Sequence, residues 1–139
     1  MPTVLYAEDD AEHRLMVRII LRDTGITLIE AVDGVEALQK IQDHRPDLIL
    51  LDLFMPKLDG HGVMKALKAD PATQDIPIVV LSAWPTGDNR KRAKLAGAVE
   101  FVTKPYKPEQ LAALIKKYVS AQTGLELTKP KPGMTPLGA

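Results

Sequence analysis

The sequence predicts a single α/β domain in which helices cover both faces of a parallel sheet. Three short runs are continuously apolar rather than alternating: Val4–Ala7, Leu48–Leu51 and Ile78–Leu81. Continuous runs of this length suit strands that are buried on both faces, as parallel strands covered by helices are. Weaker runs at Thr27–Ala31 and Val99–Val102 complete five strand–helix units. We therefore expect a five-stranded, doubly wound parallel sheet flanked by five helices.

Helix signals lie between the apolar runs. Asp33 and Glu36 form a capping box at the start of the second expected helix. Pro108 occupies a first-turn position ahead of an amphipathic stretch, which predicts the last helix. Gly25 and Gly97 follow periodic segments, where left-handed helix caps are expected.

The fourth helix and the C-terminal end carry the weakest signals. A helix over about 88–96 contains four basic side chains and few large apolar ones. We therefore expect this helix to be weakly buried and mobile. Residues 121–139 are rich in proline and glycine and show no sustained periodicity. The expected division is a folded domain at 1–120 and a tail or linker at 121–139.

Composition agrees with one compact domain and excludes several kinds of site. The chain has 139 residues, of which 45% are hydrophobic, and 18 basic side chains balance 18 acidic ones. The lack of cysteine excludes disulfides, thiolate metal sites and cysteine nucleophiles. Zero net charge argues against nucleic-acid binding by phosphate neutralisation. The apolar runs are too short to cross a bilayer and follow no basic leader, so we expect a cytoplasmic protein without membrane contact.

Polar side chains follow the apolar runs at the ends of the expected strands. These residues are Glu8 and Asp9 after the first run, Asp52 after the third, Ser82 after the fourth and Lys104 beyond the fifth. Each has an ordinary explanation as a helix cap, a turn residue or a solvated side chain, and Asp10 also suits a cap. Ligands of open α/β sheets bind beyond the carboxyl ends of the strands, where the strand order reverses. The shared position of these residues therefore favours one functional site.

Electrostatics indicates what such a cluster needs. Two carboxylates about 5 Å apart repel by about 3 kcal/mol at an effective dielectric constant of about 20. Glu8, Asp9 and Asp52 form three such pairs, which a divalent cation and the Lys104 ammonium together balance. Oxygen ligands without a nearby histidine or cysteine select a hard ion such as Mg²⁺. An ion of this kind also holds phosphoryl oxygens, which indicates phosphoryl transfer to a carboxylate nucleophile.

The chain resembles the receiver domain of two-component response regulators over about residues 1–120. Four motifs carry the resemblance in the family's order and spacing: Val4–Asp10, Asp52–Pro56 with Asp59-Gly60 after it, Pro77–Ala83, and Phe101–Pro105. The resemblance implies a flavodoxin-like fold with the strand order 2-1-3-4-5. It also implies a signalling domain that catalyses only its own phosphorylation and dephosphorylation. Such a domain acts by protein contact or by phosphorelay.

The resemblance implies a phosphoacceptor and a metal site. Asp52 is the expected phosphoacceptor. The expected ligands of Mg²⁺, for which Mn²⁺ is the expected substitute, are Glu8, Asp9, Asp52 and the main-chain carbonyl of Phe54. The expected phosphoryl donor is a sensor histidine kinase or a histidine phosphotransfer protein. A homodimer is compatible with the resemblance, and no nucleic-acid contact is expected through this chain.

The resemblance also implies how the domain responds to the phosphoryl group. Lys104 is expected to pair with the phosphoryl oxygens, and its peptide bond to Pro105 is expected to be cis. Ser82 is expected to hydrogen-bond the phosphoryl group. Ser82 and Phe101 form the expected switch, with Phe101 in the place of a frequent tyrosine.

Other functions fit the sequence less well. A phosphatase of the haloacid dehalogenase type needs a second aspartate two residues after the nucleophile, where this chain has Phe54. A flavin-binding module needs a phosphate loop after the first strand, where Glu8–Asp10 would repel the phosphate. A purely structural module explains the fold but not the acidic site. A stand-alone regulator, a phosphate shuttle and a piece of a longer protein remain open.

Overall fold

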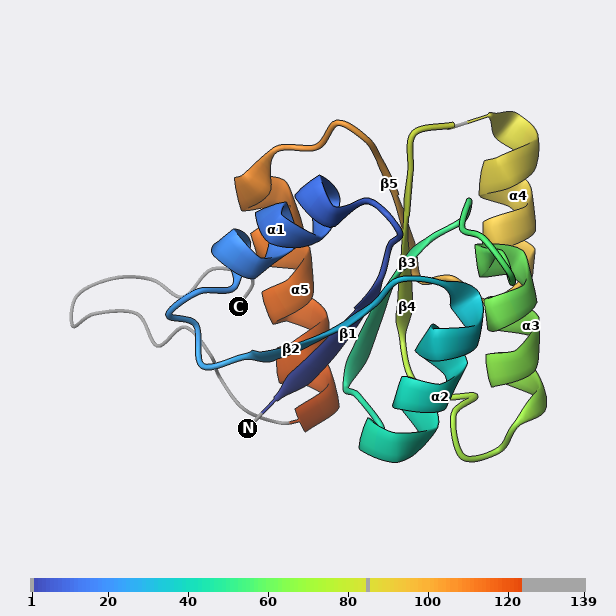
Figure 1. Cartoon of the computed structure of the whole chain (residues 1–139), viewed down its shortest axis with the longest axis horizontal. Coiled ribbons are helices and arrows are strands. Elements are labelled where there is room, and N and C mark those ends of the chain that lie inside the picture. Colours follow the sequence, from blue (N-terminus) through green and yellow to red (C-terminus); the bar gives the residue numbers. More distant parts are fainter. Residues whose placement is uncertain (1, 85, 124–139) are drawn as a thin grey trace.

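The computed structural model describes residues 2–84 and 86–123, in which five strands alternate with five helices (Figure 1). The strands are β1 (Thr3–Ala7), β2 (Thr27–Ala31), β3 (Leu48–Asp52), β4 (Ile78–Ser82) and β5 (Glu100–Thr103). The helices are α1 (Ala11–Ile20), α2 (Gly34–His44), α3 (Gly60–Ala69), α4 (Gly87–Leu95) and α5 (Pro108–Thr123). The expected fold class is confirmed.

All the strand pairs are parallel, and the sheet has the order β2-β1-β3-β4-β5. This is the order that the family resemblance implies, so that prediction is also confirmed. Ala7 at the end of β1 pairs with Ala31 on one side and with Leu51 on the other. The strand order reverses between β1 and β3, and ligands of open α/β sheets bind at the carboxyl ends of such strands.

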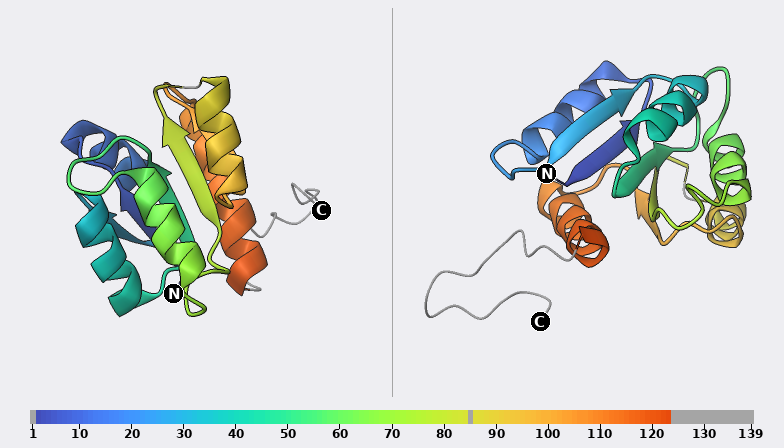
Figure 2. Two further views of the ribbon diagram at one scale, coloured as in Figure 1. Left: turned by 90° about the vertical axis from the view of Figure 1, so that its right-hand side faces the viewer. Right: turned by 90° about the horizontal axis from the view of Figure 1, so that it is seen from below.

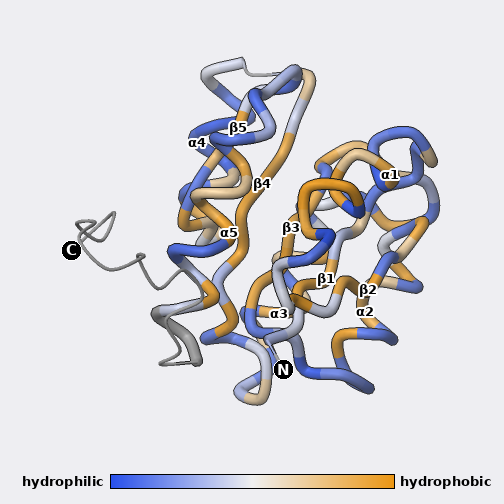
Figure 3. Tube along the Cα trace, turned by 90° about the vertical axis from the view of Figure 1, so that its left-hand side faces the viewer, coloured by the Kyte–Doolittle hydropathy of each residue, from blue (hydrophilic) through white to orange (hydrophobic). Residues whose placement is uncertain are grey.

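Two helical layers cover the sheet. Helices α1 and α5 lie on one face, and α2, α3 and α4 lie on the other (Figures 1 and 2). Successive side chains of a strand point to opposite faces, so Leu51 packs with the α2–α4 layer and Leu50 with the α1–α5 layer. All the residues of β3 and β4 are buried, and both strands are mainly orange in Figure 3. Continuous apolar runs therefore mark strands that are buried on both faces.

Side-chain caps begin four of the helices. The capping residues are Asp10, Asp33, Asp59 and Thr86. Asp33 accepts the Glu36 N–H at 2.7 Å, as the capping box predicts, but the Glu36 carboxylate accepts from Val32 N–H instead of from the cap residue. Gly25 and Gly97 adopt the expected left-handed conformation, with φ of 79° and 101°.

The boundaries differ slightly from those expected. Strand β5 begins at Glu100, one residue after the expected start of the run at Val99. Val99 lies in the preceding loop, and its side chain is exposed. Helix α4 buries only Ala93, and Leu95 is 78% exposed, which agrees with the weak burial predicted for this helix. Helix α5 continues to Thr123, past the expected boundary at residue 120, and the rest of the expected tail lies outside the described residues. No helix in the described part of the chain has the length and apolar character needed to cross a membrane.

Candidate functional site

Three carboxylates gather where strands β1 and β3 end. Glu8 and Asp9 directly follow β1, and Asp52 is the last residue of β3. One oxygen from each lies within 4.8 Å of the other two. Glu8 and Asp52 are only 1% and 7% exposed, whereas Asp9 is exposed. The fold thus brings together the three acidic side chains that the sequence places at one edge of the sheet.

Hydrogen-bond donors surround Glu8. The Lys104 ammonium donates to Glu8 Oε2 at 2.7 Å, and the Tyr6 hydroxyl donates to the same oxygen at 3.3 Å. The Asp10 N–H donates to the other oxygen, Oε1, at 3.3 Å. Burial alone raises the pKa of Glu8, but the Lys104 hydrogen bond and charge outweigh it, so this pKa lies below its ordinary value. Glu8 is therefore a carboxylate.

Asp52 has weaker compensation. Its Oδ1 accepts the Phe54 N–H at 3.3 Å, and its Oδ2 lies 3.9 Å from the Lys104 Nζ. Burial raises the pKa of Asp52 to about 7; the Lys104 charge opposes this shift, and the neighbouring Glu8 charge adds to it. One ammonium thus leaves the carboxylates incompletely balanced. A hard divalent cation held by carboxylate oxygens fits this donor set and this charge.

Ser82 and Lys104 join the ends of β4 and β5. The Lys104 N–H donates to the Ser82 carbonyl at 2.8 Å, and the Lys104–Pro105 peptide bond is cis. The Ser82 hydroxyl is fully buried and accepts the Trp84 N–H at 3.1 Å. Among the described contacts it makes no hydrogen bond to a carboxylate. Among the described residues, the ammonium therefore bonds to the acidic cluster and the Ser82 hydroxyl bonds to the main chain of the loop after β4.

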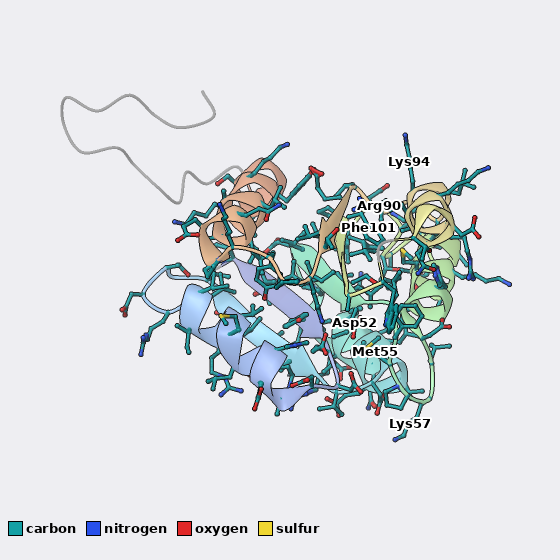
Figure 4. All side chains as sticks on the ribbon, turned by 90° about the horizontal axis from the view of Figure 1, so that it is seen from above. Asp52, Met55, Lys57, Arg90, Lys94 and Phe101 are labelled. Carbon is teal, nitrogen blue, oxygen red and sulfur yellow. The ribbon has the colours of Figure 1, made fainter. Side chains whose placement is uncertain are left out.

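Phe101 lies on β5, apart from Asp52, and makes a side-chain contact that the sequence did not predict (Figure 4). The Arg90 guanidinium carbon lies 4.8 Å from the centre of the Phe101 ring, and Arg90 also donates to Thr103 Oγ1 at 2.8 Å (Figure 4). Phe101 is half-buried against the α2–α4 side of the core. Arg90 therefore covers the residue expected to act as the switch.

His13 and Tyr6 are further site residues that sequence reasoning missed. His13 Nδ1 lies 3.3 Å from Glu8 Oε1 and 3.0 Å from Lys104 Nζ, so the expectation of a site without a nearby histidine is wrong. The available signals were positional: His13 stands in the first turn after β1, and Tyr6 precedes Glu8 by two residues on an extended chain. Asp10 has the ordinary role of capping α1.

We expect Asp52 to stabilise the metal-free protein increasingly as the pH falls from about 7 towards 5. The pKa of Asp52 is about 7 in the fold against an ordinary value of 3.8, so the folded state binds this proton more strongly than the unfolded chain does. The lowered pKa of Glu8 acts in the opposite direction below its ordinary value of 4.5. Burial lowers the pKa of His61 from its ordinary value of 6.5, which also acts in the opposite direction, so the Asp52 contribution is the difference between wild type and a variant that lacks this carboxylate. Thermal unfolding in a chelator, compared between wild type and Asp52→Asn, measures the effect. The variant should lose this pH dependence; equal pH dependence in both proteins would contradict the prediction.

Comparisons with known proteins give the family. The model of the family described as "Response regulator receiver domain" matches residues 4–116. The phosphate regulon transcriptional regulatory protein PhoB of Escherichia coli (strain K12) is 39% identical over 113 residues, which make up 81% of this chain and 49% of that protein. The chain spans about half the length of the PhoB relatives that it matches.

Two solved structures agree with the family match in fold. Chemotaxis protein CheY4 of Vibrio cholerae has a TM-score of 0.79 at 32% identity, covering 85% of this chain and 98% of that one. The receiver domain of sensor histidine kinase PA1611 from Pseudomonas aeruginosa PAO1 has a TM-score of 0.78 at 25% identity, covering 86% and 98%. That structure has a magnesium ion coordinated in its active site cleft. Because the family model matches most of the length of this chain, the chain belongs to the response regulator receiver domain family.

Proposed function

We propose that Asp52 accepts a phosphoryl group and that the domain relays this event through contacts with other proteins. The observation that carries the proposal is the placement of Asp52, a buried carboxylate beside Glu8 and Asp9 with the Lys104 ammonium 3.9 Å away. The family membership supports a signalling role in a two-component system. The cytoplasmic location and the domain limits of 1–120 expected from the sequence belong to the same proposal.

The acidic cluster would hold Mg²⁺, with Mn²⁺ as a substitute because it is also a hard ion. The proposed ligands are Glu8, Asp9, Asp52 and the main-chain carbonyl of Phe54. When bound, the ion supplies positive charge that offsets the carboxylates and the phosphoryl oxygens. The magnesium ion in the cleft of the PA1611 receiver domain supports this assignment.

The proposed reaction uses side chains of this chain as nucleophile and charge partner. A carboxylate oxygen of Asp52 attacks the phosphorus of a phosphohistidine, the P–N bond breaks as the P–O bond forms, and the departing imidazole takes a proton from solvent. Lys104 then moves from its place beside Glu8 to the phosphoryl oxygens. The Ser82 hydroxyl, whose oxygen accepts the Trp84 N–H, donates its own proton to a phosphoryl oxygen.

The proposed phosphoryl donor is a sensor histidine kinase or a histidine phosphotransfer protein, because receiver domains of this kind interact with histidine kinases. Incubation with acetyl phosphate and Mg²⁺ tests the function without a cognate kinase. We expect intact-mass spectrometry to show one phosphoryl group per chain, which is lost in alkali as acyl phosphates are. Continuous release of phosphate without a modified chain would instead indicate a phosphatase, and no reaction would indicate a binding module.

We further propose that the phosphoryl group changes the surface formed by α4, β5 and α5. Inward movement of Ser82 would free space for Phe101, whose ring now lies beneath Arg90. Binding of beryllofluoride, a phosphoryl mimic, should therefore shift the amide resonances of Phe101 and of residues 90–94. Asp52→Asn should show no such shift. Unchanged resonances in wild type, despite bound mimic, would contradict the coupling.

A further inference from the structure

We propose that His13 is a positioning residue that holds the Lys104 ammonium beside Glu8 and so slows phosphoryl acceptance by Asp52. The inference rests on the proposed role of Asp52 as phosphoacceptor. Its basis is a set of three distances from Lys104 Nζ: 2.7 Å to Glu8 Oε2, 3.0 Å to His13 Nδ1 and 3.9 Å to Asp52 Oδ2. The ammonium thus lies closest to two groups that do not receive the phosphoryl group.

The balance of donors and acceptors gives the role of His13 in its contact with Lys104. A lysine ammonium carries three protons and no lone pair, so it only donates. In the 3.0 Å contact His13 Nδ1 is therefore the acceptor and Lys104 is the donor. The same Nδ1 lies 3.3 Å from Glu8 Oε1. His13 thus provides the Lys104 ammonium with a second acceptor beside Glu8.

His13 lies between the Lys104 ammonium and solvent. The Lys104 side chain is only 9% exposed with the imidazole in place. His13 itself is 46% exposed and stands on α1, a different element from those that carry Asp52 and Lys104. Its Nε2 lies 4.0 Å from Asp10 Oδ2, on the residue that caps the same helix. The ring is thus set between the helix cap and the lysine.

This arrangement opposes the movement that phosphoryl acceptance requires. Lys104 pairs with phosphoryl oxygens on Asp52 only after it leaves its present partners, and His13 stabilises it where it is. Removal of the His13 acceptor should therefore speed the reaction by about tenfold, the effect of one modest hydrogen bond to a charged donor. Glu8 also holds Lys104, but it is a proposed metal ligand, so only His13 can be varied without removing part of the cation site.

Two substitutions separate the acceptor from the bulk of the side chain. His13→Ala removes the acceptor, whereas His13→Asn retains one, because the asparagine Oδ1 can occupy the place of Nδ1. His44→Ala is the matched control, because His44 is also exposed but ends α2. Phosphorylation rates are measured with acetyl phosphate at saturating Mg²⁺, so that neither kinase docking nor metal affinity enters the comparison. We expect faster phosphorylation of His13→Ala, and wild-type rates for His13→Asn and His44→Ala.

A second measurement reports the contact without any phosphoryl transfer. The ¹⁵N resonance of the Lys104 ammonium in the unphosphorylated protein should shift in His13→Ala and stay near its wild-type position in His13→Asn. An unshifted Lys104 resonance in His13→Ala, or an unchanged or slower phosphorylation rate, would overturn the proposal. A wild-type protein that takes up no phosphoryl group would refute the proposed function instead, and the resonance would still decide whether His13 holds Lys104.

Discussion

Asp52→Asn is expected to abolish phosphoryl acceptance and to leave the fold intact. Asparagine has almost the same shape as aspartate, but its amide lacks the anionic oxygen that attacks phosphorus. The substitution also removes one of two buried negative charges that lie close together, so the metal-free variant should unfold at a higher temperature than wild type near pH 7. Loss of function with a gain in stability is the signature expected of a functional buried charge.

Intact-mass spectrometry after incubation with acetyl phosphate and Mg²⁺ measures the loss, and thermal unfolding measures the gain. Asp23→Asn is the matched control, because Asp23 is exposed in the loop between α1 and β2 and has a φ of 62°, a conformation that asparagine tolerates. The control should accept a phosphoryl group as wild type does. Wild-type phosphorylation of Asp52→Asn would place the acceptor on another residue.

Gly34→Ala is expected to destabilise the protein by about 3 kcal/mol, the upper end of the usual range for overpacking. Gly34 begins α2, and a Cβ there would overlap the carbonyl oxygen of Leu58 and lie 2.7 Å from the Leu58 Cβ. Since part of the obstacle is main chain, a rotamer change does not relieve it. The displaced segment is the loop between β3 and α3, which also carries Phe54, so affinity for Mg²⁺ should fall as well.

Chemical denaturation measures the stability, and isothermal titration calorimetry measures the affinity for Mg²⁺. Gly87→Ala provides the comparison, because Gly87 also begins a helix, α4, and a Cβ there would meet nothing within 4 Å. That variant should match wild type in both measurements. Equal stability of Gly34→Ala and Gly87→Ala would show that the loop between β3 and α3 can shift away from the added Cβ without a cost in the free energy of unfolding.

The sequence predicts well those features of the fold that depend on the burial of apolar side chains. The runs at Leu48–Leu51 and Ile78–Leu81 lie in buried strands, and the acidic residues at the ends of β1 and β3 meet at one end of the sheet. Apolar character alone does not mark where a strand begins. The run expected to start at Val99 therefore begins one residue too early, because Val99 lies in the loop before β5.

Side-chain contacts between elements were less accessible to sequence reasoning. His13 reaches Lys104 across 91 residues of chain, and Arg90 reaches Phe101 from a helix with almost no apolar face. Such contacts depend on how α1 and α4 are oriented over the sheet, which periodicity does not determine. The strand order itself came from the family resemblance rather than from the residues.

The fully buried β3 has a consequence for how this domain can be altered. Because Asp52 terminates a strand with no exposed residue, the core sets the position of the carboxylate that we propose as the phosphoacceptor. Substitutions meant to alter the acidic site without disturbing the core should therefore be made in the loops that follow the strands rather than in β3 itself.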